Sequence, residues 1–165
     1  MIEVTTTYLE IGALQDLRRK AAADARFEVR EASVPQWQVN RFLYCHVGER
    51  WGWTDKRTWP EERWQKYVDS ADLRTFIGSV DGSIAGYYEL RKQGSEVEIA
   101  YFGLTAAFIG RGLGGALLTS AIEQGFAWGA TRVWVHTCTL DHPAALANYT
   151  ARGMRVFKTS TERRA

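Results

Sequence analysis

The chain has 165 residues, of which 45% are apolar and 24% charged, as is typical of one globular domain with its own core. Its 21 basic and 19 acidic residues leave a formal charge of +2. This charge is too balanced for a protein that binds nucleic acid through a strongly basic surface. The first residues, Met1-Ile-Glu-Val-Thr, carry an acid and hydroxyls where a signal peptide has a basic start and an apolar run, so we expect no signal peptide, and no stretch approaches the ~20 apolar residues of a membrane span. The two cysteines, Cys45 and Cys138, form no CxxC pair. We therefore expect a single cytoplasmic domain over residues 1–165, with reduced thiols, no metal, and neither nucleic acid nor membrane as partner.

Two strand-like segments open the chain. Residues 2–11 are rich in β-branched side chains and predict a strand, whereas residues 12–25 are polar and predict a short helix or turn. Phe27–Glu31 alternates apolar and charged residues, which predicts a second strand.

Two helices should follow these strands. Ser33-Val-Pro-Gln36 and Thr58-Trp-Pro-Glu61 both have the spacing of a capping box, with proline near the first turn. We therefore expect one helix that ends near Gly48 and a second that ends near Ser70.

A meander and then an alternation of helices and strands complete the chain. Asp81-Gly82 is a strong hairpin turn, and Gly94 marks a second turn. The expected elements are, in order, strands over Leu73–Val80, Ser83–Lys92 and Glu96–Leu104, a helix over Leu113–Trp128, a strand over Arg132–Thr137, a helix over Pro143–Arg152 and a strand over Met154–Ser160. This order predicts an α/β sandwich with a mixed sheet.

A glycine cluster lies where a loop enters the helix expected over Leu113–Trp128. Its glycines lack Cβ atoms, so the backbone N–H groups can approach a ligand closely. The helix N-terminus adds partial positive charge and Arg111 adds a full one, and together they favour a pyrophosphate. The glycines of this cluster are Gly110, Gly112, Gly114 and Gly115.

The same glycines also match the dinucleotide-binding pattern Gly-x-Gly-x-x-Gly. That pattern requires a tight strand-to-helix turn and an acidic residue at the end of the next strand. Here seven residues separate Leu104 from Gly112, and the next strand reads Val133-Trp-Val-His-Thr-Cys, without an acid. Too little chain follows residue 130 for the second half of such a fold, so a dinucleotide oxidoreductase is a disfavoured alternative.

From about Phe27 onward the chain resembles the GNAT superfamily of acetyl-CoA-dependent N-acetyltransferases. The segments that carry the resemblance occur in the family's order, and they are Val-Glu-Ile-Ala-Tyr-Phe-Gly-Leu over residues 97–104, Arg111-Gly-Leu-Gly114, Val133–Thr137 and Asn148-Tyr-Thr-Ala-Arg-Gly153. The resemblance implies an α/β domain with a mixed, mostly antiparallel central sheet, flanked by helices and splayed beside the coenzyme A site. Residues 1–26 are then an extra N-terminal segment.

The resemblance also implies where acetyl-CoA, the co-substrate, would bind. The family's phosphate loop, Gln/Arg-x-x-Gly-x-Gly/Ala, maps onto residues 109–114, although Ile109 replaces the usual polar first residue. Phe102 and Leu104 match strand positions whose backbone pairs with pantetheine, and Asn148 could hydrogen-bond the same arm. The loop residues implied as contacts are Gly110, Arg111, Gly112, Leu113 and Gly114.

Two residues match catalytic positions of the family. Tyr149 matches a tyrosine that supplies a proton or hydrogen bond to the departing thiolate; the alternative is a core tyrosine on an amphipathic helix. Glu98 matches a strand glutamate that serves as general base, because an amine must be neutral to attack a thioester. The lesser candidates are His136, Asp141 and His142.

In this family the region between the first two helices usually shapes the acceptor pocket. Here that region is rich in aromatic residues, whose rings either form a wall for an aromatic or ammonium acceptor or bury a long loop. The candidate rings are Trp51, Trp53, Trp59 and Trp64, with Tyr87, Tyr88 and Tyr101 from the strands.

The function implied is transfer of an acetyl group from acetyl-CoA to a small-molecule or peptide amine by direct attack on the thioester. The alternative is a coenzyme-A-binding sensor or pseudoenzyme without catalysis. Tyr149 and Glu98 together favour the enzyme, whereas Ile109 favours the sensor.

The chain departs from the family at its end. Family members usually place two strands after the helix that carries Tyr149, whereas one strand precedes Thr161–Ala165 here. A right-handed crossover through that helix leaves room for an antiparallel strand beside Arg132–Thr137, and an empty slot would expose a hydrophobic edge. We expect residues 2–11 to fill the slot; the alternatives are the opposite edge, beside Phe27–Glu31, or a second subunit in a homodimer.

Overall fold

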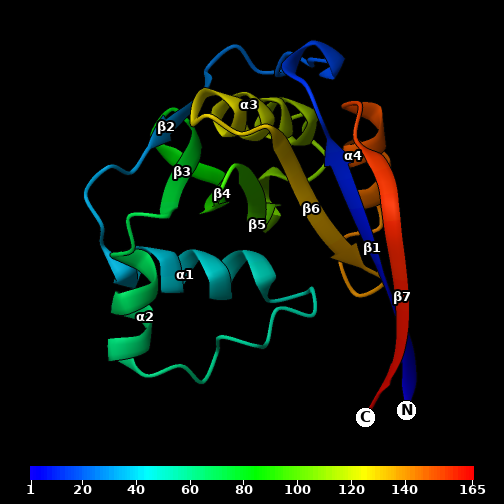
Figure 1. Ribbon diagram of the computed structural model, residues 1–165. Coiled ribbons are helices and arrows are strands. Elements are labelled where there is room, and N and C mark those ends of the chain that lie inside the picture. The colour runs from blue at the N-terminus through cyan, green and yellow to red at the C-terminus, as the bar shows by residue number, and fades with distance from the viewer.

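A seven-stranded sheet forms the centre of the structure, with helices on both of its faces (Figure 1). This computed structural model describes all 165 residues. The strands are β1 (Ile2–Ile11), β2 (Phe27–Glu31), β3 (Leu73–Val80), β4 (Ser83–Gln93), β5 (Glu96–Leu104), β6 (Arg132–Cys138) and β7 (Arg155–Arg164). The helices are α1 (Trp37–Gly48), α2 (Glu61–Val68), α3 (Gly114–Ala127) and α4 (Ala145–Ala151).

The strand order is β2-β3-β4-β5-β6-β1-β7, and only the β5–β6 pair is parallel. The sheet is therefore mixed and mostly antiparallel, as predicted. The dinucleotide-binding alternative is wrong, because that fold requires an open and mostly parallel sheet. None of the four helices combines the length and the apolar character needed to cross a bilayer.

β1 lies between β6 and β7 and is antiparallel to both (Figure 1). Tyr8, for example, pairs with His136 of β6 and with Lys158 of β7. The prediction that residues 2–11 fill the slot beside β6 is confirmed. Because β1 offers β7 a partner as far as Ile2, β7 continues to Arg164, beyond the predicted end of the last strand.

Both capping-box predictions are wrong, although both helices exist. The residue before α1, Gln36, is not helical, with φ −140° and ψ 88°, and the residue before α2, Pro60, is extended with φ −70° and ψ 163°. Neither helix start has a side-chain cap. Proline disfavours a helical backbone in the residue before it, so no helical turn forms at Ser33 or Thr58, and each helix begins after its proline.

α3 and α4 pack on one face of the sheet, and α1 and α2 pack on the other (Figure 1). The largest core cluster lies on the α3 side and includes Val97 and Ile99 of β5. Smaller clusters under α1 and α2 include Tyr44 and Tyr87. Because side chains alternate along a strand, Glu98 points to the α1 side.

A bulge at Ala100 resets this alternation in β5. The register with β4 shifts there, so Ala100 is an extra residue between Ile99 and Tyr101. As a result Tyr101 packs on the α1 side, on the same face as Glu98, although the two lie three positions apart in the strand. Phe102 returns to the α3 side.

Candidate active site

β5 and β6 separate soon after they begin. They pair only over residues 96–98 and 132–134. Beyond Glu98, β5 has β4 on one side and no strand on the other. The expected splay is therefore present, and it leaves the backbone of Phe102 and Leu104 without a strand partner on the side of β6.

A cavity of about 860 Å³ lies at this opening, within the range of about 300–1,000 Å³ that is common for small-molecule sites. Its wall includes Phe102 and Tyr149 from the α3 side of the sheet and Glu98 and Tyr101 from the α1 side. The cavity therefore reaches both faces of the sheet through the gap between β5 and β6.

The glycine loop at one end of the cavity is built to present backbone donors. Gly110 and Gly112 have φ values of 79° and 74°, a left-handed region that only glycine adopts without strain. α3 then begins without a side-chain cap, and the N–H groups of Gly114, Gly115 and Ala116 have no acceptor within the protein. Free donors and the positive end of the helix dipole together suit an anion.

Two of the predicted loop contacts turn their side chains away from the cavity. The Arg111 guanidinium lies 5.0 Å from the centre of the Phe108 ring, in a separate hollow beside Asp24. Leu113 packs with Val80 and Ala85 in a small core cluster, so only its backbone can serve the cavity. A ligand contact from the Arg111 side chain stays a prediction that this geometry does not favour.

The extra N-terminal segment crosses the glycine loop. The backbone N–H of Ala23 donates to the carbonyl of Gly112 at 3.3 Å, and that of Lys20 donates to Thr119 Oγ1 at 3.0 Å. The Lys20 side chain lies against Gly115 and lines the cavity. No local pattern in the sequence places residue 20 beside residue 115, so this positive charge was not predicted.

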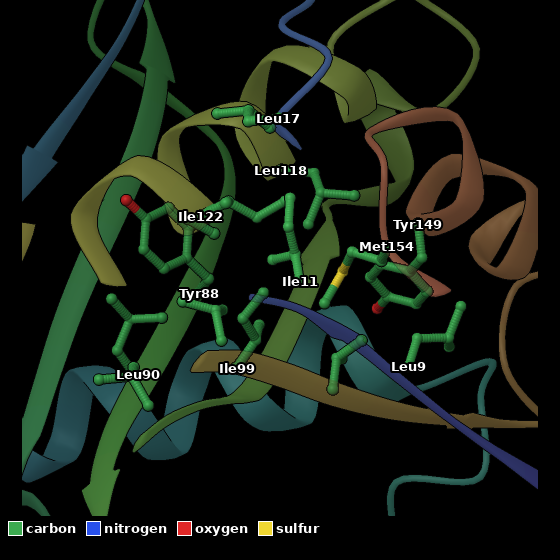
Figure 2. Close-up of a cluster of buried hydrophobic side chains, with 14 of the residues drawn as sticks. Leu9, Ile11, Leu17, Tyr88, Leu90, Ile99, Leu118, Ile122, Tyr149 and Met154 are labelled. Atoms are coloured by element: carbon green, nitrogen blue, oxygen red, sulfur yellow. The ribbon is translucent and has the colours of Figure 1, made fainter. Parts of the chain in front are cut away.

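Tyr149 belongs both to the core and to the cavity wall. It is 5% exposed and reaches from α4 into the main core cluster beside Met154 (Figure 2). Its ring meets that of Phe102 edge-on at 6.1 Å. Burial raises the pKa of Tyr149 above its usual value, so the phenol keeps its proton at neutral pH.

Asn148, next to Tyr149, ties α4 to the start of α3. Its Nδ2 donates to the Gly114 carbonyl at 3.1 Å, while its side-chain oxygen makes no hydrogen bond within the protein. Because Asn148 also lines the cavity, this oxygen is available to a ligand.

Glu98 enters the cavity from the opposite face, with 4% of its side chain exposed. Arg91 Nη2 donates to Glu98 Oε2 at 2.6 Å, and this guanidinium compensates for the burial of a carboxylate. His136 Nε2 lies 3.9 Å from Glu98 Oε1, and its side chain is half-exposed. Glu96, on the same strand face, instead pairs with Arg132 at 3.0 Å.

The two loops at the mouth of the cavity meet each other. Trp51 contacts the ring of His142 edge-on at 4.9 Å, which joins the α1–α2 loop to the β6–α4 loop. Asp141 accepts hydrogen bonds from Thr137 Oγ1 and the Cys138 N–H, so its carboxylate holds the turn after β6. Asp141 is therefore engaged in structure rather than free to act as a base.

The aromatic candidates for the acceptor side divide into three groups. Trp51, Trp53 and Tyr101 line the cavity. Tyr87, Tyr88 and Trp64 are buried in the core instead. Trp59 is half-buried and packs against Trp64 without lining the cavity. Three further residues complete this side of the cavity and were not predicted from the sequence: Asp55, Lys56 and Tyr67.

Residues 28–154 match the profile of the Acetyltransferase (GNAT) family. With this fold and well over half of the chain matched, the chain belongs to that family. Among curated proteins it is similar to the mycothiol acetyltransferase of Corynebacterium glutamicum (strain R), at 28% identity over 144 residues. These residues are 87% of this chain but 48% of that protein, and a second mycothiol acetyltransferase is covered to 44%. The chain thus spans about half the length of the curated relatives it matches.

Solved structures share the fold. A GCN5-related N-acetyltransferase from Kribbella flavida superposes with a TM-score of 0.69 at 18% identity, over 95% of this chain and 56% of that one. One from Sphaerobacter thermophilus gives 0.69 at 17% identity, over 94% and 49%.

Proposed function

We propose that this chain transfers an acetyl group from acetyl-CoA to the nitrogen of an amine. The observation that carries the proposal is the gap between β5 and β6, which Glu98 and Tyr149 flank from opposite faces of the sheet. A thioester held in that gap would have a proton acceptor on one side and a hydrogen-bond donor on the other.

The residues present fit acetyl-CoA. The free N–H groups at the start of α3 suit its pyrophosphate, and Lys20 adds a charge beside them. The unpaired backbone of β5 near Phe102 and Leu104 suits the amides of the pantetheine arm, as does the side-chain oxygen of Asn148. These contacts need no side chain at position 109, so Ile109 is compatible with binding.

Glu98 is suited to receive the proton of the incoming amine. Its pairing with Arg91 supports the ionised carboxylate, which is the form that accepts a proton. The half-exposed imidazole of His136 lies on the same face and can pass the proton on to solvent. Together these groups leave the amine neutral as it attacks.

Tyr149 is suited to stabilise the departing sulfur. Because burial raises its pKa above the ordinary value near 10, its phenol is a weaker acid than a thiol, whose pKa is about 8.5. Tyr149 therefore acts on the thiolate by donating a hydrogen bond rather than by complete proton transfer. In the absence of the phenol, charge on the sulfur would face an apolar wall that includes Phe102.

The experiment is incubation of the protein with acetyl-CoA and a panel of amines while free thiol is followed, with calorimetry of coenzyme A binding alongside. Amine-dependent thiol release supports acetyl transfer. Coenzyme A binding without release for any amine favours the sensor alternative. Absence of coenzyme A binding contradicts both.

A further inference from the structure

The ammonium group of Lys56 lies in a cage of aromatic rings. Its Nζ is 4.6 Å from the centre of the Trp59 ring, 5.3 Å from that of Tyr67 and 4.7 Å from that of Tyr101. It also donates hydrogen bonds to Asp55 Oδ2 at 3.0 Å and to Tyr101 Oη at 2.7 Å. Only 12% of the Lys56 side chain is exposed, which is unusual for lysine.

The walls of this cage are held in place by a second layer of hydrogen bonds. Tyr44 Oη donates to Asp55 Oδ1 at 2.7 Å. Tyr67 Oη donates to the buried carboxyl of Glu89, which also accepts from Asn40 Nδ2 at 2.9 Å. Asp55 and Tyr67 are therefore held by contacts that do not depend on Lys56.

Asp55 supplies the negative charge of the cage. Its partial burial opposes ionisation, but hydrogen bonds from Tyr44 and Lys56 outweigh this and lower the pKa of Asp55 below its ordinary value. A carboxylate and three aromatic rings around one ammonium group are typical of a site that binds alkylammonium ligands.

The cage opens into the cavity that contains Glu98. Asp55, Tyr67 and Tyr101 line that cavity together with Glu98, and the bulge at Ala100 puts Tyr101 on the same face as Glu98. A ligand in the cage therefore shares a continuous space with the proposed base.

We propose that this ammonium cage, formed by Asp55, Trp59, Tyr67 and Tyr101, is a subsite for the acceptor, and that Lys56 occupies it until the acceptor displaces its ammonium. Because the attacking amine must be neutral, the ammonium in the cage is a second amino group. The acceptor class is thus a compound with at least two amines, one held in the cage and one presented to Glu98. The acceptor part of this inference rests on the proposed acetyl transfer, whereas binding in the cage does not.

Lys56→Ala empties the cage and should preserve the loop. The backbone N–H of Lys56 donates to Tyr44 Oη at 3.1 Å, and this bond does not need the side chain. The probe is n-propylammonium, which replaces the lost end of the side chain, with n-propanol as its uncharged counterpart. Binding is followed by intrinsic fluorescence, because Trp59 forms one wall.

We expect Lys56→Ala to bind n-propylammonium at least about tenfold more tightly than the parent, since a tethered group competes at an effective concentration in the millimolar range. n-Propanol should show no such gain. The matched control is Lys158→Ala, whose ammonium lies 4.9 Å from one ring, that of Tyr8; emptying that contact should create no site. If folded Lys56→Ala binds the ammonium no better than the parent, Lys56 is a structural clamp and the cage is not a ligand site.

The acceptor part is tested by turnover. In Lys56→Ala, kcat/KM for 1,4-diaminobutane relative to n-butylamine should rise at least about tenfold over the parent. Asp55→Asn, which keeps an oxygen for Tyr44, should raise KM for the diamine by a similar factor, and by more than it raises KM for the monoamine. This comparison tests the acceptor assignment even if Lys56→Ala does not fold. An unchanged diamine preference in both variants overturns the acceptor assignment. The fluorescence titration needs no acetyl-CoA, so failure of the cage and failure of acetyl transfer are distinguishable.

Discussion

A negative charge at Gly112 is a sharp test of the proposed pyrophosphate site. Gly112 has φ 74°, and a Cβ placed on it would lie 2.9 Å from the Cβ of Ala23. A left-handed backbone costs a residue other than glycine about 1–2 kcal/mol. Gly112→Asp should therefore lower the free energy of unfolding by about 1–2 kcal/mol, through strain alone.

The effect of Gly112→Asp on coenzyme A binding should be larger than this loss of stability. Two unit charges about 4 Å apart repel by about 4 kcal/mol at an effective dielectric constant of about 20. Solvent screening at this exposed loop reduces the repulsion, and half of it, about 2 kcal/mol, corresponds to a roughly 30-fold rise in Kd. Denaturation with urea gives the change in stability, and calorimetry gives the Kd of coenzyme A.

Gly94→Asp is the matched control for this substitution. Gly94 has φ 61°, with open space around its Cβ position, and it lies in the turn between β4 and β5, outside the cavity lining. Gly94→Asp introduces the same charge at a similar cost in backbone strain, and it should leave the Kd of coenzyme A unchanged. If Gly112→Asp binds coenzyme A as tightly as Gly94→Asp, the pyrophosphate does not lie at this loop.

Four further changes test other parts of the structure. Tyr149→Phe should lower kcat at least about tenfold, because a hydrogen bond to a charged group contributes about 1.5–3 kcal/mol, and it should leave acetyl-CoA affinity nearly unchanged. An unaltered single-turnover rate would show that Tyr149 has only a structural role in the core. Glu98→Gln should slow the reaction most at low pH, where the amine arrives protonated, and a pH–rate profile that superimposes on the parent's would remove Glu98 from the mechanism. Burial raises the pKa of Glu89 above its ordinary 4.5, so above about pH 4.5 the unfolded chain releases a proton that the folded chain retains. The free energy of unfolding should therefore fall as pH rises above about 4.5. Denaturation of Glu89→Gln between about pH 5 and about pH 7 should show a smaller fall, and a slope equal to that of the parent would contradict this. Deletion of residues 1–11 should give aggregated or unfolded protein because it uncovers β6 and β7, and a stable truncated monomer that binds coenzyme A would refute that role for β1.

Periodicity and turn residues in the sequence predict most of the sheet. Asp81 and Gly82 have the two positive φ values, 47° and 81°, that a tight hairpin turn requires. Residues 2–11 were placed by topology, since a crossover through α4 leaves one slot and one spare strand. The end of β7 could not be predicted from its own polar residues, because the length of β7 depends on pairing with its partner strand β1.

The acceptor side of the cavity was the least predictable part of the site. The ammonium cage joins Lys56, from a loop, to Tyr67 of α2 and Tyr101 of β5, and no sequence spacing relates the three. Tyr101 faces the cage because of the bulge at Ala100, an irregularity without a local signal in the sequence. The glycine loop was easier to recognise, because its glycines lie close together in the sequence and the positive φ values of Gly110 and Gly112 are a local property.

The fate of an isotope-labelled acetyl group tests whether this protein transfers acetyl to nitrogen. Labelled acetyl-CoA is incubated with the protein and with the diamine and monoamine acceptors, and the products are analysed by mass spectrometry before and after hydroxylamine treatment. Acetyl transfer to nitrogen predicts a labelled acetylamine that survives hydroxylamine, because an amide resists it, and predicts that the label is reduced in Tyr149→Phe and Glu98→Gln. Recovery of the label only as free acetate, or an equal yield of acetylamine without the protein, would contradict acetyl transfer by this protein.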